Sequence, residues 1–143
     1  MEKIIADTEY LEFAEKVIGI NFGSDAKAIA RIVDGRTRAV CVFEAFCEVD
    51  CRIHIATDSS FMPISRAFIK HCFWYPFVQL KLNRVTGLVP ASNKRALKFD
   101  LGLGFVYEGL LRKGLPDDDL IILGMTREEC RFIPSIHRGL QDG

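Results

Sequence analysis

The sequence predicts a mixed α/β fold, in which helices flank a partly antiparallel central sheet of about six strands. Three features of the sequence indicate this class. Two apolar segments meet at Asp34-Gly35, a pair typical of a tight hairpin turn. After Pro63 the apolar residues change from alternate spacing to helical spacing. The C-terminal half then alternates strand and helix patterns, as a sheet with crossover helices requires.

The N-terminal part is predicted to contain one helix followed by three strands. The helix runs from about Thr8 to Ile18, and Asp7 or Thr8 can cap its first turn. The two hairpin strands span Ala26 to Val33 and roughly Arg38 to Glu48. A further strand, Cys51 to Ala56, follows after a tight connection.

The strand from Arg38 to Glu48 is apolar on both faces, which places it inside the sheet. Strict alternation along the strand predicts which side chains share a face. One face is expected to carry Ala39, Cys41, Phe43, Ala45 and Cys47, and the other Val40, Val42 and Phe46.

The C-terminal part is predicted to contain two helices and three strands. Apolar positions from Ile64 to Tyr75 recur at helical spacing, and this helix is expected to end before Pro76. Asn93 is placed to cap a shorter helix. The remaining elements are predicted as a strand at Arg84–Pro90, a helix at Lys94–Leu101, and strands at Phe105–Arg112 and Leu120–Thr126.

The composition limits the possible function classes. The chain has 143 residues, 49% hydrophobic and 27% charged, so we expect one globular domain over residues 1–143. Its 19 Lys and Arg residues balance 19 Asp and Glu residues, which argues against a nucleic-acid partner. No segment has the pattern of a signal peptide or a membrane span. The 5 irregularly spaced cysteines indicate reduced thiols, so a cytoplasmic location is expected.

The stretch from Arg84 to Ala96, closing on Leu103 to Arg112, resembles the second half of the Gcn5-related N-acetyltransferase fold. It is most similar to the branch that includes ribosomal-protein N-terminal acetyltransferases. There is a looser resemblance to short acetyltransferase-like proteins of tailed phages. The matching pieces are a strand ending shortly before Asn93, a Gly104-Phe105 pair opening the next strand, Tyr75-Pro76-Phe77 at a helix end, and Gly124 to Glu129 as a closing strand.

This resemblance implies that acetyl-CoA is the cofactor. In the fold, two neighbouring parallel strands splay apart and expose backbone groups with which the pantetheine arm can pair. Here the candidate strands are Cys51–Ala56 and Arg84–Pro90, joined by a helix whose N-terminal amides suit the pyrophosphate. The positions expected to contact the coenzyme are Ile55, Ala56, Met62, Pro63, Ile64, Ser65, Arg66, Asn93 and Arg95.

The loop before the crossover helix departs from the family pattern. The family usually carries a basic residue or Gln and two glycines there, whereas residues 59–66 contain no glycine. Ser60, Ser65 and Arg66 can compensate with hydroxyl and guanidinium donors, or they can serve as ordinary capping residues. Lys94, Arg95 and Lys98 are either surface charges or partners for the coenzyme's 3′-phosphate.

Three residues are candidates for proton transfer during acylation of an amine. Glu44 interrupts an apolar strand face, where burial would raise the pKa of a carboxylate, and His54 lies on the strand expected to face the acyl group. The structural alternatives are that Glu44 pairs with an Arg and that His54 is a satisfied sheet residue. The family often places Tyr or Ser on the helix after the Asn, but the comparable positions are taken to be Ala96 and Phe99. Tyr107 is therefore the nearest candidate acid, with a packed strand aromatic as its alternative.

A zinc site is not expected. Cys47, Cys51 and His54 lie close in sequence, but residues four apart on an extended strand are roughly 13 Å apart. No second ligand pair follows them, so we expect no metal.

The function predicted from the sequence is acetyl transfer from acetyl-CoA to a primary amine, by direct attack in a ternary complex. The acceptor can be a small molecule or a protein, and the resemblance also allows a homodimer. Two other functions remain open. The first is a catalytically impaired binding or assembly module, in a phage context, and the second is modification of nucleic-acid bases, against which the zero net charge argues.

Overall fold

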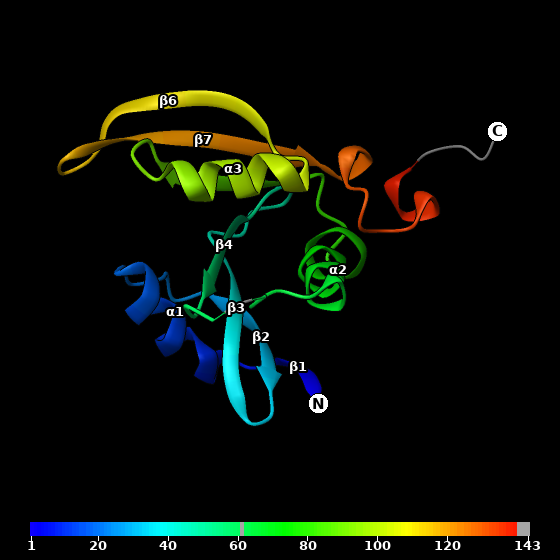
Figure 1. Ribbon diagram of the computed structural model, residues 1–143. Helices are drawn as coiled ribbons and strands as arrows, with labels where there is room; N and C mark the ends of the chain where they lie inside the picture. The colour runs from blue at the N-terminus through cyan, green and yellow to red at the C-terminus, as the bar shows by residue number, and fades with distance from the viewer. Residues whose placement is uncertain (61, 140–143) are drawn as a thin grey trace.

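The computed structural model describes residues 1–60 and 62–139, and these form one sheet with helices packed on it (Figure 1). The sheet has 7 strands in the order β1-β2-β3-β4-β5-β7-β6. The strands are β1 (Glu2–Ala6), β2 (Lys27–Val33), β3 (Arg36–Glu44), β4 (Arg52–Thr57), β5 (Arg84–Pro90), β6 (Val106–Leu115) and β7 (Asp118–Thr126). The helices are α1 (Leu11–Ile18), α2 (Arg66–Trp74) and α3 (Lys94–Leu103). The predicted mixed α/β class is confirmed, with β1 as a strand that the sequence patterns did not indicate.

The N-terminal half of the sheet is an antiparallel run from β1 to β4. The β2–β3 hairpin turns at Asp34 and Gly35, whose φ angles of 51° and 79° are both positive. A two-residue hairpin turn of type I′ needs positive φ at both central positions, and Asn, Asp and Gly tolerate it best. Asp7 caps the 3-10 turn before α1, because its carboxylate accepts a hydrogen bond from the Glu9 N–H at 2.9 Å.

β3 is buried on both faces, as predicted, and separates two hydrophobic clusters. Phe43 belongs to the larger cluster beneath α2, and Val42 to the smaller cluster beneath α1. The prediction for Phe46 was wrong, because its side chain packs against the larger cluster. The strand ends at Glu44, and the following Ala45 has a φ of 52°, so the alternation of faces stops there.

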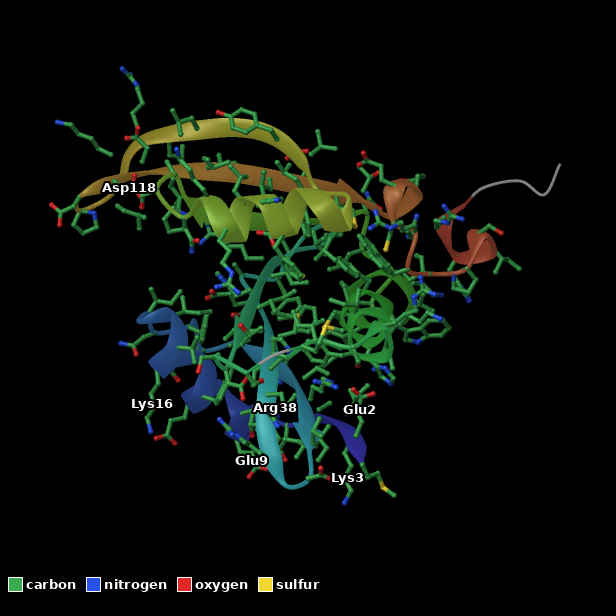
Figure 2. All side chains as sticks on the ribbon, in the orientation of Figure 1. Glu2, Lys3, Glu9, Lys16, Arg38 and Asp118 are labelled. Carbon is green, nitrogen blue, oxygen red and sulfur yellow. The ribbon has the colours of Figure 1, made fainter. Side chains whose placement is uncertain are left out.

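α1 and α2 lie on opposite sides of β3 and β4 (Figure 1). The α-helix ends at Trp74, before Pro76 as predicted, but the chain keeps a helical path beyond it, which the prediction did not include. A π-helical turn, Tyr75–Gln79, continues α2 through the proline, and the Leu80 N–H closes it on the Tyr75 carbonyl five residues back. No helix within residues 1–60 and 62–139 is long and apolar enough to cross a membrane. The charged side chains of Lys3, Glu9 and Lys16 lie at the periphery (Figure 2).

A polar cluster holds the C-terminal strands together near the start of β5. Arg84 donates to the Glu108 carboxylate at 2.6 and 3.2 Å and to the Thr86 hydroxyl at 3.1 and 3.3 Å. Thr86 in turn donates to the Asp50 carboxylate at 2.8 Å. Glu108 reaches Arg84 by crossing over β7 at Gly124, where a side chain would overlap its carboxylate. The absence of a side chain at Gly124 is therefore required for an ion pair between β5 and β6.

Substituting Gly124 by Ala tests this crossing. A methyl group there forces Glu108 away from Arg84, and we expect the free energy of unfolding to fall by about 1 kcal/mol, as for the loss of a partly exposed ion pair. Urea denaturation measures the change. Gly109→Ala on β6 is the matched control, because its nearest neighbour, Ile122, is 3.9 Å from an added methyl group. Equal losses from both variants would contradict the assignment.

Candidate active site between β4 and β5

β4 and β5 are the parallel neighbours in the sheet, and they pair at one position only, Arg52 opposite Thr86. The Thr86 N–H donates to the Cys51 carbonyl at 2.9 Å, just below that pair. Beyond it β4 keeps its partner β3 as far as Thr57, and β5 keeps its partner β7 as far as Pro90. The two strands therefore separate, as the family resemblance implied, and each has one edge that is not hydrogen-bonded to the other.

The separation opens into a cleft of about 160 Å³. β4 and β5 form two of its walls, α3 forms a third, and the end of α1 closes one side. Three polar side chains converge on this mostly apolar cleft: His54 from β4, Asn93 at the start of α3, and Asp100 from the body of α3. The apolar lining comes from Ile18, Ile53, Ile55, Leu88, Val89, Phe99 and Phe105.

His54 and Glu44, which the sequence offered as separate candidates, form a pair. His54 lies opposite Val42 in the β3–β4 register, so Glu44 is its diagonal neighbour on the same face. Their side chains are 12% and 13% exposed, and His54 Nε2 lies 2.7 Å from Glu44 Oε2. That oxygen lies off the direction of the ring N–H, so the contact is a close approach without a linear hydrogen bond. The other Glu44 oxygen accepts from the Gly23 N–H at 2.9 Å.

The surroundings of His54 favour its neutral form. Burial lowers the pKa of His54, and the nearby Glu44 carboxylate raises it by a smaller amount, so the net shift is downward. The Phe22 ring packs against the imidazole, with a distance of 5.2 Å between ring centres. Because Nε2 faces the carboxylate, the neutral tautomer with its proton on Nε2 is favoured. Nδ1 is then free to accept a proton.

Asn93 is both an N-cap and a residue of the cleft. Its side-chain oxygen accepts a hydrogen bond from the Ala96 N–H at 3.1 Å, which satisfies one donor of the first turn of α3. The side-chain amide donates no hydrogen bond to residues 1–60 or 62–139. The two predicted roles, cap and ligand contact, are therefore geometrically compatible at one residue.

Asp100 is a cleft residue that the sequence analysis missed. It lies two helical turns after Asn93, on the face of α3 that lines the cleft. Desolvation by its apolar surroundings raises the pKa of Asp100 from 3.8 to about 6. Within the described part of the chain, its carboxylate makes neither a hydrogen bond nor an ion pair. The available signal was a carboxylate at helical spacing from Asn93, among apolar positions.

The backbone before α2 is held in place from β2. Arg31 Nη1 donates to the Met62 and Pro63 carbonyls at 3.1 and 2.9 Å. Ser65 caps α2, since its hydroxyl accepts from the Phe68 N–H at 3.1 Å. Met62 has a positive φ of 55°, a conformation that glycine adopts more readily. These contacts order the segment without the glycines of the family pattern.

The remaining predicted residues of this loop differ in what they can offer a ligand. The Ser60 hydroxyl is engaged by the Asp58 carboxylate. Ile64 packs against the larger cluster. Arg66 is exposed at the start of α2 and pairs with no other described residue. Phe61, part of the same loop, lies outside the described residues.

The other candidates are not all brought to the cleft. Ile55 lines it, whereas Ala56 is buried in the smaller cluster beneath α1. Arg95 is exposed in the first turn of α3. Tyr107 is 54% exposed on β6 and is not a lining residue, so its catalytic role stays a prediction. Among the described residues, no group of three His, Cys, Asp or Glu side chains is arranged to hold a metal ion.

A larger hollow of about 420 Å³ lies elsewhere, between the β1–β2 strands and α2. Its lining includes Ile4, Ile29, His71 and Trp74. We place the candidate site in the smaller cleft for two reasons. The parallel strands separate there, and His54 and Asp100 converge there with perturbed pKa values.

The raised pKa of Asp100 has a consequence for stability. Because the folded pKa lies above the ordinary value, the folded state is penalised once pH exceeds about 6, by roughly 2–3 kcal/mol. Asp100→Asn removes this penalty, so at pH 7.5 the variant should be about 2 kcal/mol more stable than the wild type. The gain should shrink as pH falls through 6 and vanish near pH 4, where the wild-type carboxyl is neutral in both states.

Urea denaturation at several pH values measures this difference. Asp117→Asn, in the exposed turn between β6 and β7, is the control and should give no pH-dependent gain. A stability gain in Asp100→Asn that is the same at pH 4.5 and 7.5 would show that the carboxyl is not desolvated.

No protein-family model matches this sequence, and no curated protein sequence does. Solved structures do match. A variant of the spermidine N-acetyltransferase SpeG from Vibrio cholerae has a TM-score of 0.74 at 12% identity, over 87% of this chain and 93% of that chain. The ribosomal-protein-S18-alanine N-acetyltransferase from Escherichia coli has a TM-score of 0.66 at 19% identity, over 88% and 94%.

The N-acetyltransferase PseH from Campylobacter jejuni, solved in complex with acetyl coenzyme A, has a TM-score of 0.63 at 16% identity. The match covers 88% of this chain and 99% of that chain. These likenesses extend over nearly the whole of each structure and agree with the sheet and cleft described above. The chain therefore has the fold of the Gcn5-related N-acetyltransferases.

Proposed function

We propose that this protein transfers the acetyl group of acetyl-CoA to a primary amine by direct attack in a ternary complex. The observation that carries the proposal is the cleft between β4 and β5, in which separated strand edges meet a buried His54–Glu44 pair. The separated edges provide a binding surface for an extended ligand, and the pair provides a base.

The residues present fit the coenzyme. An amide-containing chain such as pantetheine can lie between β4 and β5 and use their free backbone groups as an additional strand would. In the first turn of α2 the N–H groups of Arg66 and Ala67 lack intrahelical partners, which suits a pyrophosphate. The free guanidinium of Arg66 adds a charged donor. At the other wall, the amide of Asn93 is available to the pantetheine arm.

His54 is the proposed base. An amine attacks a thioester only as its neutral form, and the new carbon–nitrogen bond releases one proton that must be accepted. His54 is neutral at neutral pH because burial lowers its pKa, and Glu44 stabilises the imidazolium that forms on proton uptake. The acetyl thioester supplies the electrophilic carbonyl; the protein supplies orientation and proton transfer.

The acceptor is proposed as a primary amine because of the activities of structural neighbours. One neighbour is named as a spermidine N-acetyltransferase and another as acting on the alanine of ribosomal protein S18. The mostly apolar cleft, with few polar groups, suits the neutral form of such an amine.

The second candidate is a binding module that has lost catalysis. It is favoured by the glycine-free loop before α2, where the hydroxyls of Ser60 and Ser65 are already engaged by other residues of the protein. In that case the pyrophosphate would find Arg66 and two backbone amides as its main donors. Weak or absent coenzyme binding would be the result.

Calorimetric titration with acetyl-CoA, followed by mass spectrometry of spermidine and an alanine-initiated peptide, tests the proposal. We expect saturable binding and an acetylated amine. His54→Gln should keep the binding but lower kcat by about 100-fold, as for loss of a general base. His71→Gln, an exposed histidine on α2, is the matched control and should retain activity. Binding without transfer in the wild type would favour the module, and no binding at millimolar acetyl-CoA would contradict coenzyme use.

The double role of Asn93 gives a separate prediction. Asn93→Ala should lower the free energy of unfolding by about 1 kcal/mol, because the cap is lost, and should also weaken acetyl-CoA binding. Asn93→Asp and Asn93→Ser still cap α3 but lack the amide donor, so they should keep most of the stability and lose coenzyme affinity. If both retain full affinity in the calorimeter, Asn93 is a cap only.

A further inference from the structure

Asp100 faces the cleft from α3, on a different wall from His54. We propose that Asp100 is the proton donor to the sulfur atom that leaves when the acetyl group is transferred. This inference rests on the proposed function and assigns to the same site a second proton-transferring residue, which the sequence patterns did not suggest.

The first step of the argument is position. The cleft-lining residues of α3 are Asn93, Ala96, Phe99 and Asp100, which recur at helical spacing along one face. Asn93 at the start of this face is the proposed contact for the coenzyme arm. Asp100 lies two turns, or about 10 Å, further along the same face of the helix. A ligand that contacts Asn93 and extends along α3 therefore brings its reactive end towards Asp100.

The second step is the absence of a competing partner. The carboxylate of Asp100 makes no hydrogen bond or ion pair to residues 1–60 or 62–139. Its neighbours in the lining are apolar, among them Ile18, Phe99 and Phe105. A carboxyl group so placed keeps its proton to a higher pH than an exposed one does, and in the protonated form it has one O–H to donate. A bound ligand would exclude further water and strengthen this preference.

The third step is the proton balance of the reaction. The amine nitrogen bonds to the thioester carbonyl carbon, the carbon–sulfur bond breaks, and its electron pair stays on sulfur. Sulfur takes the proton of Asp100 and leaves as a free thiol. The attacking nitrogen loses one proton to His54. Asp100 then regains a proton and His54 releases one, so an amine and a thioester give an amide and a thiol with no net change in protons.

Other groups near the cleft do not fill this role. Ala96 and Phe99 carry no transferable proton, and Tyr107 is not a lining residue. Lys94, Arg95 and Lys98 are exposed on α3. The charged and titratable groups on the elements that face Asp100 are His54 with Glu44 across the cleft, those three basic residues on α3 itself, Lys16 on α1, and Arg131, which donates to the Gly102 carbonyl at 2.6 Å. The pKa shift of Asp100 is caused by desolvation.

The choice of a carboxylic acid has a measurable effect on pH dependence. The pKa of Asp100 is about 6, so the protonated form declines as pH rises through 6. A phenol at the same position would stay protonated to about pH 10. With both substrates saturating, kcat should therefore fall as pH rises, with an inflection near pH 6 where Asp100 loses its proton.

Asp100→Asn and Asp100→Tyr test the assignment, with whichever of spermidine or an alanine-initiated peptide the wild type acetylates. Asp100→Asn keeps the side-chain shape, and kcat at pH 6 should fall about 100-fold while the KM values for amine and acetyl-CoA change little. The inflection near pH 6 should disappear. Asp100→Tyr restores a donor, so it should be more active than Asp100→Asn and move the inflection above pH 8. Asp117→Asn is the matched control and should behave as the wild type.

Three outcomes would overturn the proposal. The first is an unchanged kcat and pH profile in Asp100→Asn, measured on a variant whose folding is verified by circular dichroism. The second is a raised KM for the amine with an unchanged kcat, which would assign Asp100 to binding a cationic acceptor. The third is a wild type that transfers no acetyl group, which would overturn the proposed function and this inference with it. The first two leave the proposed function intact, so the failures are distinguishable.

Discussion

The single pairing of Arg52 with Thr86 is the constraint on which the rest of the site depends. Below this pair, ion pairs of Arg84 with Asp50 and Glu108 hold the strands together. Above it, β4 stays paired with β3 and β5 with β7, so β4 and β5 separate. The cluster sits partly exposed at the point of divergence, where backbone pairing ends. Its hydrogen bonds fix the base of the opening, because Asp50, just before β4, is tied to Thr86 and Arg84 of β5.

The electrostatics of the cleft follow from this opening and from its apolar lining. Burial moves the pKa of His54 down and that of Asp100 up, which favours the neutral form of both groups. The Glu44 carboxylate lies next to His54 and accepts a hydrogen bond from the Gly23 amide. Pairs of titratable groups whose surroundings alter their pKa values are a recurrent arrangement for acid–base work. Below about pH 6 Asp100 is protonated and can donate to a leaving group, while His54, with its lowered pKa, can still accept a proton.

Much of the fold could be predicted from local patterns, whereas the site depended on pairings between distant residues. The turn at Asp34-Gly35 and the cap at Asn93 are local features of composition and spacing, whereas the separating strands were implied by the family resemblance. The partnership of Glu44 with His54 depends on the β3–β4 register, which neither strand specifies alone. Asp100 was missed because a carboxylate on an exposed-looking helix gives no sign of burial until the cleft around it is known.

The errors in the fold have equally specific causes. A proline normally ends a helix, but here α2 changes to a π-helical turn at Tyr75, and this wider turn contains Pro76. Phe46 was assigned to the wrong face because alternation was extended past Glu44, where the positive φ of Ala45 ends the strand. β1 is a short edge strand with weak alternation, and its pairing with β2 becomes evident only in three dimensions.

The narrow join between β4 and β5 also divides the sheet into two blocks. β1 to β4 form one block from consecutive antiparallel neighbours, and β5 to β7 form the other around α3. Each block is built from contacts that are mostly close in sequence, so each can assemble rapidly from its own residues. Few backbone hydrogen bonds join them, and an extended ligand between their edges would supply the missing ones. The larger hydrophobic cluster spans both blocks and couples their unfolding, and a ligand that bridges the two strand edges would strengthen this coupling.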